Sequence, residues 1–301
     1  MYIDVLQIVI IYSDIRDQLK LCQLNNDTNK YLKIYDLFDL PYEIRKNITQ
    51  DILMQLKFNN LKRLNVYYNT YVVDVNHLAH SLIELNCGYG SAISQDGIKK
   101  LTKLQKLNVQ FNRNITNVNH LAESLIELKC DGYCGIGQSG IDGLTKLQTL
   151  TAVDNIKIKN VNHLSDSLIQ LNCSGYCGIG QKGIKHLKKL QKLLTYNNTK
   201  IKDVNHLADS LIKLECAWQS GINQNGISKL KKLKVLHAND NKKIVNVNHL
   251  SESLIELHCC FTCGIDNDGI SKLNKLRKIC LEGNEKIENN KYINSIDKII
   301  L

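Results

Sequence analysis

The sequence predicts an α/β solenoid, a curved array of short coils with parallel strands on its concave side and short helical turns on its convex side. The phrase "VNHLAESLIELKC" returns with small changes every 43 residues, starting at Val75, Val118, Val161, Val204 and Val247. A fixed period of this length is the signature of a stacked repeat architecture. Proline occurs once, at Pro41, as expected where a parallel ladder uses each backbone N–H group.

Each 43-residue period contains two coils that share one apolar spacing. In the copy that starts at Val118, the first half places Leu125, Leu128 and Cys130 as L-x-x-L-x-C. The second half, 144–158, reads L-x-x-L-x-x-L-x-A-x-x-N-x-x-I. This is the spacing of leucine-rich repeats. A coil of 21 or 22 residues cannot bury its apolar face alone, so we expect neighbouring coils to stack.

Alternation along each short strand predicts which side chains point into the core. The leading inward residue recurs eleven times, at Leu64, Leu85, Leu107, Leu128, Leu150, Leu171, Leu193, Leu214, Leu236, Leu257 and Ile279. Once in each 43-residue period a glycine precedes an apolar residue where the chain leaves the strand edge and enters the convex turn; glycine suits a positive φ or a close backbone approach there. These glycines are Gly97, Gly140, Gly183, Gly226 and Gly269.

Four segments follow from these patterns. Residues 1–32 lie outside the repeat and carry apolar residues at helical spacing, with Asp4 as a helix N-cap and a break near Ser13. Residues 33–60 are predicted as a degenerate first repeat and N-terminal cap. The solenoid occupies residues 61–289, and residues 290–301 form a C-terminal cap.

The cysteines that recur in the phrase are predicted to form a buried column, because cysteine packs as a small apolar group. They are Cys87, Cys130, Cys173, Cys216 and Cys259. The best metal-binding spacing is C-x-x-C at Cys260 to Cys263, but no second pair lies at a suitable distance, so neither a metal site nor a cofactor is expected.

The recurring histidines form a second column. Neighbouring members are two coils apart, about 10 Å at the spacing of parallel strands, which is too far to share an ion. We expect each histidine and the asparagine before it to satisfy backbone groups where the chain turns into the next coil. The histidines are His77, His120, His163, His206 and His249. No nucleophile with a base and no phosphate loop is apparent, so an enzyme is not expected.

Aromatic residues follow the strand cysteines by two or three positions, at the concave rim. They are Tyr89, Tyr133, Tyr176, Trp218 and Phe261. Exposed rings at a rim would be anchors for a partner protein. Rings turned inward would instead cap the core beneath the turn. The sequence leaves both interpretations open.

Lysine and arginine number 39 against 29 acidic residues, a formal charge of +10, which favours acidic partners. Lysines crowd the segments on or beside the convex turns, at Lys182, Lys185, Lys188, Lys189, Lys192, Lys229, Lys231, Lys232 and Lys234. Such a stripe could hold nucleic acid by its phosphates, the alternative to a protein partner. No aromatic residues are interleaved to stack on bases, so a protein partner is preferred.

The apolar start, 5–12, is too short to span a bilayer and lacks the features of a signal peptide. Eleven cysteines without an export signal are expected to stay reduced. We therefore predict a cytoplasmic protein without membrane contact.

Residues 1–32 resemble an F-box, in which an apolar helix, a polar break and an Asp-Leu segment precede a final short helix; Asp17-Gln18-Leu19 stands in the Asp-Leu place. Residues 61–289 resemble the cysteine-containing repeats of F-box proteins, as in "CGIGQSGIDGL" from Cys134. The whole chain resembles the F-box and leucine-rich-repeat proteins of large DNA viruses that infect amoebae.

This resemblance implies the substrate-recognition subunit of a Skp/cullin-type ubiquitin ligase. The solenoid would hold the target, and a Skp-type adaptor would contact Val5, Leu6, Val9, Leu19 and Leu21. The alternative within the same class is a plain protein-interaction scaffold.

Overall fold

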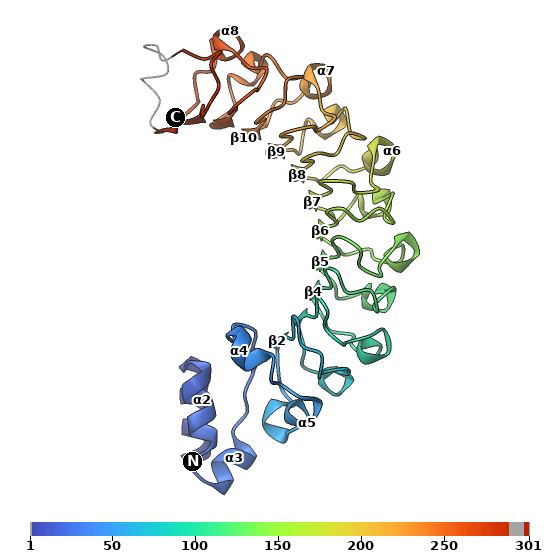
Figure 1. The fold of residues 1–301 in the computed structure, drawn as a ribbon, viewed down its shortest axis with the longest axis vertical. Helices are drawn as coiled ribbons and strands as arrows, with labels where there is room; N and C mark the ends of the chain where they lie inside the picture. The colour runs from blue at the N-terminus through green and yellow to red at the C-terminus, as the bar shows by residue number, and fades with distance from the viewer. Residues whose placement is uncertain (1, 289–297, 301) are drawn as a thin grey trace. The chain divides into compact units, whose positions relative to one another are not determined.

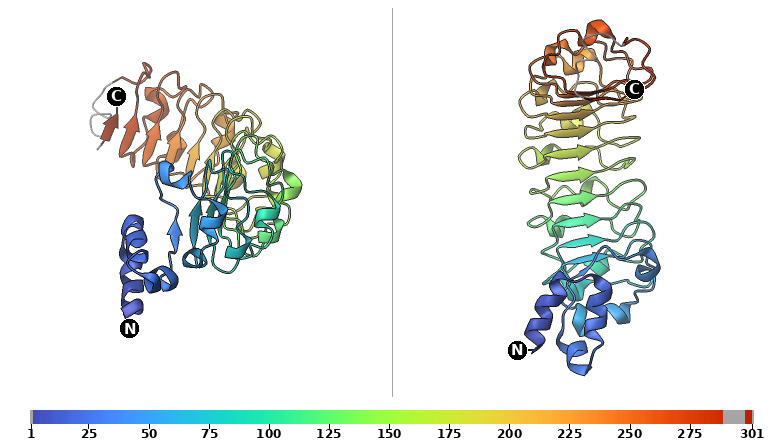
Figure 2. Two further views of the ribbon diagram at one scale, coloured as in Figure 1. Left: turned by 60° about the horizontal axis from the view of Figure 1, so that its bottom comes forward. Right: turned by 90° about the vertical axis from the view of Figure 1, so that its left-hand side faces the viewer.

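The computed structural model describes residues 2–288 and 298–300 (Figure 1). The chain forms two compact units, Met1–Leu147 and Gln148–Leu301. In each unit the short strands lie side by side, and the short helices lie on the opposite side of the coils (Figures 1 and 2). The repeating leucine spacing is therefore wound into coils, as the sequence predicts.

Unit 1 begins with three helices, α1 (Tyr2–Tyr12), α2 (Ile15–Cys22) and α3 (Asn26–Tyr31). The helix α1 contacts α2 and α3, and α3 contacts the 3₁₀ turn η1 (Leu56–Phe58). Asp14 caps α2, since its side chain accepts hydrogen bonds from the amides of Arg16 and Asp17. The expectation that Asp4 is an N-cap is wrong, because α1 already begins at Tyr2 and Asp4 lies in its first turn.

Within its described residues, unit 1 has five parallel strands in chain order. They are β1 (Asp36–Leu37), β2 (Arg63–Asn65), β3 (Glu84–Asn86), β4 (Lys106–Asn108) and β5 (Glu127–Lys129). The turns between them are α4 (Tyr42–Arg45), α5 (Gln50–Leu53), η1, η2 (Asn76–Leu78), η3 (Asp96–Ile98) and η4 (Asn119–Leu121), and η5 (Gln138–Gly140) follows β5. The strand β1 pairs Leu37 with Leu64, so a strand of the series lies within the segment 33–60, before the first predicted inward residue Leu64.

Unit 2 has eight parallel strands in its described residues. They are β6 (Thr149–Thr151), β7 (Gln170–Asn172), β8 (Lys192–Leu194), β9 (Lys213–Glu215), β10 (Val235–His237), β11 (Glu256–His258), β12 (Lys278–Cys280) and β13 (Lys298–Ile300). Its turns are η6 (Asn162–Leu164), α6 (Gln181–Ile184), η7 (Asn205–Leu207), α7 (Gln224–Ile227), η8 (Asn248–Leu250) and α8 (Asn267–Ile270). The predicted C-terminal cap, 290–301, lies outside the described residues except for β13.

The eleven predicted inward residues are the central residues of β2 to β12, and all are buried. The cysteine column is also confirmed as core, since Cys87, Cys130, Cys173, Cys216 and Cys259 have no exposed surface. All eleven cysteines of the chain are buried thiols. These small side chains fill the space behind each strand, where a larger residue would press against the next coil.

The recurring glycines are required by close approach and not by positive φ. A Cβ placed on Gly183 would lie 2.2 Å from the backbone oxygen of Lys159 in the preceding coil. Gly97, Gly140, Gly226 and Gly269 meet the preceding coil in the same way. Only glycine lets the helical turn rest directly on the backbone beneath it.

The recurring asparagines, and three of the recurring histidines, bind the backbone of neighbouring coils as expected. His77 differs, because both of its ring nitrogens are buried without a hydrogen-bond partner among the described residues. The Asn205 amide donates to the carbonyl of Asn225 at 2.7 Å and accepts from the amide of Lys229 at 2.8 Å, both in the next coil. Nε2 of His206 lies 2.9 Å from the carbonyl oxygen of Ile184 in the preceding coil. Equivalent contacts are made by Asn76, Asn119, Asn162, Asn248, His120 and His249.

A further asparagine column lies inside the coils. The side chain of Asn198 is buried and donates to the carbonyls of Cys173 at 2.7 Å and Ile179 at 3.1 Å. Its oxygen accepts from the amide of Lys200. Asn69, Asn112, Asn241 and Asn284 are held similarly. This column satisfies carbonyls that the ladder leaves without partners.

Candidate functional site

Two surfaces of the coils carry side chains that differ between copies. We call the outward side chains of the strands the strand face. We call the turns that follow the strands the rim. At the rim, the chain passes through the left-handed region at Tyr68, Tyr89, Phe111, Gly132, Asp154, Gly175, Asn197, Trp218, Asp240, Phe261 and Gly283, and in the coil of Tyr89 also at Gly90.

The five predicted aromatic residues occupy two rim positions and not one. Tyr89, Trp218 and Phe261 are themselves the left-handed residues, with φ of 46°, 57° and 56°. Tyr133 and Tyr176 instead follow a left-handed glycine. The spacing of two or three residues after the strand cysteine corresponds to these two positions, because the glycine shifts the ring one residue along the turn.

The rings point to solvent, which decides between the two interpretations of the sequence. The exposed fractions are 68% for Tyr133, 83% for Tyr176, 51% for Trp218 and 43% for Phe261. Tyr89 is half-buried because other rings surround it. An inward cap beneath the turn is therefore not their role.

Unit 1 gathers an aromatic cluster that the sequence analysis missed. The ring centroid of Tyr89 lies 4.8 Å from Tyr67, 5.7 Å from Tyr68 and 4.5 Å from Phe111. Tyr68 and Phe111 occupy the left-handed position of the coils without a strand cysteine. Comparing adjacent coils at this position, instead of alternate ones, would have found them.

The left-handed conformation is fixed by the backbone. The amide of Trp218 donates to the carbonyl of Asn239 in the next coil at 2.7 Å, and that of Phe261 donates to Glu282 at 2.6 Å. Glycine, asparagine and aspartate adopt this conformation readily and fill the position in other coils. A bulky aromatic residue there is strained, and such strain is typical of functional positions.

The ring of Trp218 stands between two hollows of the rim in unit 2. Its centroid lies 5.2 Å from that of Tyr196. One hollow, of about 590 Å³, is lined by Tyr176, Tyr196 and Trp218 among others. The second, of about 680 Å³, lies between Trp218 and Thr262. An exposed ring flanked by hollows has the shape of a binding anchor.

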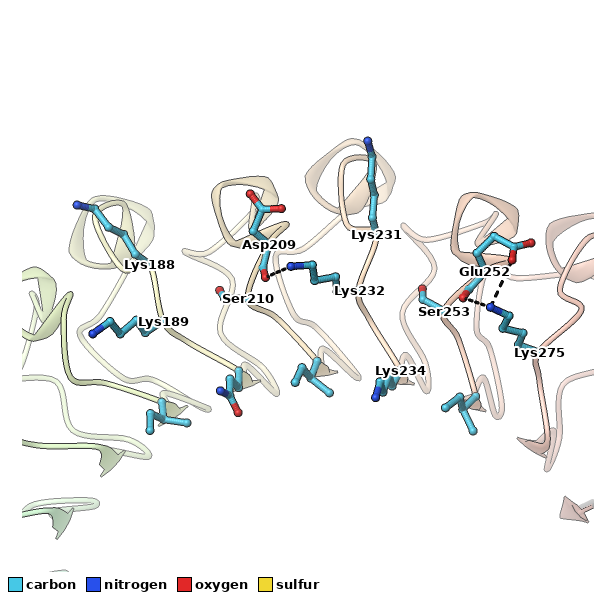
Figure 3. Close-up of a pocket in the computed structure, with 14 residues that line it drawn as sticks. Lys188, Lys189, Asp209, Ser210, Lys231, Lys232, Lys234, Glu252, Ser253 and Lys275 are labelled. Atoms are coloured by element: carbon cyan, nitrogen blue, oxygen red, sulfur yellow. Dashed lines mark hydrogen bonds and ion pairs between the residues drawn. The ribbon is translucent and has the colours of Figure 1, made fainter.

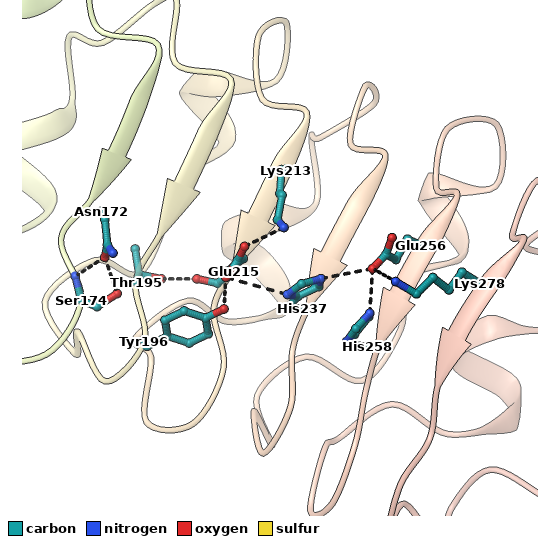
Figure 4. Close-up of polar contacts among 10 residues, drawn as sticks. All are labelled: Asn172, Ser174, Thr195, Tyr196, Lys213, Glu215, His237, Glu256, His258 and Lys278. Atoms are coloured by element: carbon teal, nitrogen blue, oxygen red, sulfur yellow. Dashed lines mark hydrogen bonds and ion pairs between the residues drawn. The ribbon is translucent and has the colours of Figure 1, made fainter. Parts of the chain in front are cut away.

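The strand face of unit 2 carries a connected polar network (Figure 4). The Tyr196 hydroxyl donates to Glu215, and Lys213 pairs with Glu215 at 2.8 Å. His237 lies between two carboxylates, with Nδ1 3.8 Å from Glu215 and Nε2 3.6 Å from Glu256. These contacts link outward side chains of β9, β10 and β11, and Tyr196 joins them from the turn after β8.

The carboxylate of Glu256 is the centre of the network. Its Oε1 lies 2.7 Å from His258 Nε2 and 2.7 Å from Lys278 Nζ. Burial alone would raise the pKa of Glu256, but the hydrogen bonds from Lys278 and His258 outweigh it and lower the pKa to about 2. Burial, with His258 and Lys213 nearby, lowers the pKa of His237 to about 4. Glu256 is therefore charged and His237 neutral at pH 7.

Lysines line a groove where the chain of unit 2 enters its strands (Figure 3). The groove has a volume of about 870 Å³ and contains six lysines and two carboxylates, Asp209 and Glu252. The lysines are Lys188, Lys189, Lys231, Lys232, Lys234 and Lys275. Lys192 does not lie beside a helical turn as expected, since it is the first residue of β8 on the strand face.

The predicted adaptor residues lie on the first two helices. Val5 and Val9 are 55% and 45% exposed on α1, whereas Leu6, Leu19 and Leu21 are half-buried. Ile8 adds to the exposed apolar surface of α1. In the described part of the chain, no helix combines the length and apolar character needed to cross a membrane.

No protein-family model matches the sequence. Likewise, no curated protein matches it. Among solved structures, an internalin (inlF) of Listeria monocytogenes is 22% identical, with a TM-score of 0.57 over 81% of this chain and 82% of its own. The functional domain of InlJ from Listeria monocytogenes, described as including a cysteine ladder, is 19% identical with a TM-score of 0.50; the match covers 86% of this chain and 65% of that one.

Both similar structures are leucine-rich-repeat proteins, and at this identity the likeness concerns the fold. The strands, the turns opposite them and the buried leucine and cysteine columns agree with it. The chain therefore has the fold of a leucine-rich-repeat α/β solenoid.

Proposed function

We propose that this protein is a non-catalytic, protein-binding solenoid of a reducing, cytoplasmic compartment. It holds its partner against the strand face and the aromatic rim. The observation that carries the proposal is the exposure of Trp218 and Phe261 at left-handed backbone positions. Eleven buried thiols suit a reducing compartment.

The physical support comes from the cost of these rings to the free protein. An exposed tryptophan contributes little to folding, and its left-handed backbone costs roughly 1–3 kcal/mol. Asn197 and Gly175 show that the same turn forms without a ring. Aromatic side chains with exposed faces and adjacent hollows are the residues that most often dominate binding energy at protein interfaces.

The test compares partner capture by matched variants. The double variant Trp218→Asn with Phe261→Gly removes both rings and introduces residues that other coils carry at that position. Val245→Lys is the control, since it removes an exposed apolar side chain away from the rim and introduces the residue found at the equivalent Lys159 and Lys202. A partner captured by the wild type and the control, and lost with the double variant, supports the proposal. Partners that the double variant retains contradict it.

The more specific form of the proposal is the substrate-recognition subunit of a Skp/cullin-type ubiquitin ligase. Its support is the F-box resemblance of residues 1–32 and the exposed apolar side chains Val5, Ile8 and Val9 on α1. An adaptor groove that covers these three residues would bury the apolar face of α1.

Titration calorimetry with a purified Skp-type adaptor tests this form. Val5→Asp with Val9→Asp changes only exposed residues and should abolish binding without unfolding the helices. Met54→Lys, an exposed position after α5, is the control. If the wild-type protein does not bind the adaptor, the ligase role is excluded and the protein is a plain interaction scaffold.

Nucleic-acid binding is the second candidate function, because the six lysines of the groove outnumber its two carboxylates. Affinity for single-stranded RNA, measured between low and physiological salt, would then fall steeply with salt concentration. Replacing Lys188, Lys231 and Lys234 by glutamine would reduce that dependence. Failure to bind at low salt excludes this candidate.

A further inference from the structure

Three side chains on the strand face of unit 2 bring metal-ligand atoms together. One ligand atom each of His237, Glu256 and His258 can be chosen so that all lie within 4.8 Å of one another. Among the described residues, no other group of three histidine, cysteine or acidic side chains brings its ligand atoms this close together. It is independent of the cysteine spacing considered in the sequence.

The strand register explains why these residues meet. His237 on β10 pairs with His258 on β11, and Val235 pairs with Glu256 in the same ladder. Glu256 and His258 lie two residues apart on one strand, so both point to the strand face. The two imidazole rings are stacked, with centroids 4.0 Å apart and planes inclined by 28°. Adjacent strands thus supply two imidazoles and one carboxylate from one side.

The orientation of His237 leaves one ring nitrogen available. Its Nδ1 faces Glu215, and its Nε2 faces Glu256 (Figure 4). Nε2 is buried and has no hydrogen-bond partner among the described residues. A carboxylate behind one imidazole nitrogen, with the other nitrogen directed at the ion, is the usual arrangement around metal-binding histidines.

We propose that His237, Glu256 and His258 bind a first-row transition-metal ion, with Zn²⁺ as the ion that this ligand set suits best. Two imidazoles and one carboxylate form a known zinc ligand set that leaves a further coordination position open. Glu215 faces the other nitrogen of His237 at 3.8 Å and would orient the ring by closing to hydrogen-bond distance when the ion binds. Because the cluster is on the strand face, the open position is directed to where a partner would bind.

The main competitor of the ion is Lys278. Its ammonium group lies 2.7 Å from Oε1 of Glu256, the oxygen that also contacts His258. The ion and the ammonium group are alternative counter-charges for one carboxylate, so binding displaces Lys278. Removal of Lys278 therefore strengthens metal binding, whereas removal of a ligand weakens it.

The chain supplies its own replacements for the test. Asn86 and Asn172 occupy the strand position of His258, Asn108 that of His237, and Gln170 that of Glu256. Thr149 occupies the position of Lys278. The variants are His237→Asn, His258→Asn, Glu256→Gln and Lys278→Thr. His80→Asn, an exposed imidazole in unit 1, is the control.

Zn²⁺ and Co²⁺ binding to the full chain is measured by titration calorimetry and by the absorption of bound Co²⁺. We expect one ion per chain and weak visible bands without the intense ultraviolet band of thiolate ligation. His237→Asn and His258→Asn should weaken binding by about tenfold or more. Lys278→Thr should strengthen it, and His80→Asn should not change it.

Three results would overturn the site. The first is that the wild type binds neither Zn²⁺ nor Co²⁺. The second is a thiolate spectrum, which would assign the ion to cysteines. The third is an unchanged affinity in both His237→Asn and His258→Asn. Circular dichroism of each variant shows whether the strands persist. If a histidine variant is unfolded, the Lys278→Thr measurement alone decides, since that change leaves every proposed ligand in place.

Discussion

The turn at η7 and the turn at the rim belong to neighbouring parts of one repeat, yet they differ in how strongly they restrict the residue type. The first keeps one residue in every copy, whereas the second accepts several. At the first, Asn205 bonds the next coil through both ends of its amide, and asparagine recurs in all five copies. At the rim the backbone amide makes the contact to the next coil, as at Trp218. A contact made by a side chain fixes the residue, whereas a contact made by the backbone leaves the residue free to serve a partner.

The largest effect expected from this contrast is at the buried asparagine column. Asn198→Leu removes a side chain that satisfies two carbonyls and one amide in the core. We expect the free energy of unfolding to fall by about 3 kcal/mol or more, because those groups stay buried without partners. Urea unfolding measures the change. Asn197→Gly, at the adjacent rim position, is the control; it removes only one exposed hydrogen bond, donated by the Gln219 amide to the Asn197 side-chain oxygen, and should cost far less. Equal losses in both variants would contradict the contrast.

The next largest effect is expected where a helical turn rests on the coil beneath it. Gly183→Ala places a Cβ 2.2 Å from the Lys159 carbonyl oxygen and should destabilise the protein by roughly 2 kcal/mol. In Gly180→Ala the nearest atom, Cβ of Lys200, is 3.2 Å away, a tight contact that a shift of a few tenths of an ångström relieves. Thermal unfolding of the two variants compares them. The tight packing of the turns is disproved if the Gly183 variant is as stable as the Gly180 variant.

An intermediate effect is expected from the histidine column as the solution is acidified. Partial burial lowers the pKa of His206 and His249, and their hydrogen bonds to Ile184 and Ile227 only partly oppose this. On acidification, the imidazoles of the unfolded chain therefore take up protons at a higher pH than those of the folded protein. Stability is complete above the usual imidazole pKa of about 6.5 and is lost as the pH falls below it.

Denaturant unfolding at several pH values between 7 and 5 measures this loss. His206→Gln with His249→Gln keeps a side-chain hydrogen-bond donor without a group that titrates in this range. The double variant should show a shallower decline than the wild type. Parallel declines would show that these imidazoles do not sense acid.

The smallest effect on stability is expected at the rim itself. Trp218→Asn should change the free energy of unfolding by less than about 1 kcal/mol, and in the direction of stabilisation, because asparagine adopts the left-handed region more readily. Chemical denaturation checks this. A clear loss of stability would mean that the ring supports the fold, which would remove the argument for a partner.

The sequence predicted most of the fold because each coil repeats the same interior. The leucine and cysteine columns follow from the strand alternation, and their burial agrees with it. It placed a degenerate first repeat at 33–60 but did not locate the strand within it, because Asp36 and Leu37 of β1 lack the repeat spacing. The start of the first helix was also misplaced at Asp4. An aspartate is favourable both as an N-cap and within the first helical turn, and here Asp4 lies in the first turn.

The site was less predictable for a geometric reason. Comparing copies 43 residues apart aligns alternate coils, so it does not bring together His237 on β10 and Glu256 on β11, although their strands are neighbours. The aromatic residues were found, but their exposure depends on the direction of a left-handed turn. Spacing alone does not reveal whether glycine or the ring itself takes that conformation, as Tyr176 and Trp218 show.

The forward direction of the Asn205 bonds bears on synthesis. Its acceptor on Asn225 and its donor on Lys229 lie twenty or more residues later in the chain. While the protein leaves the ribosome, each coil can be completed only after its successor has emerged. A nascent chain would therefore always end in one unfinished coil, and a truncated product would expose that open end to quality control.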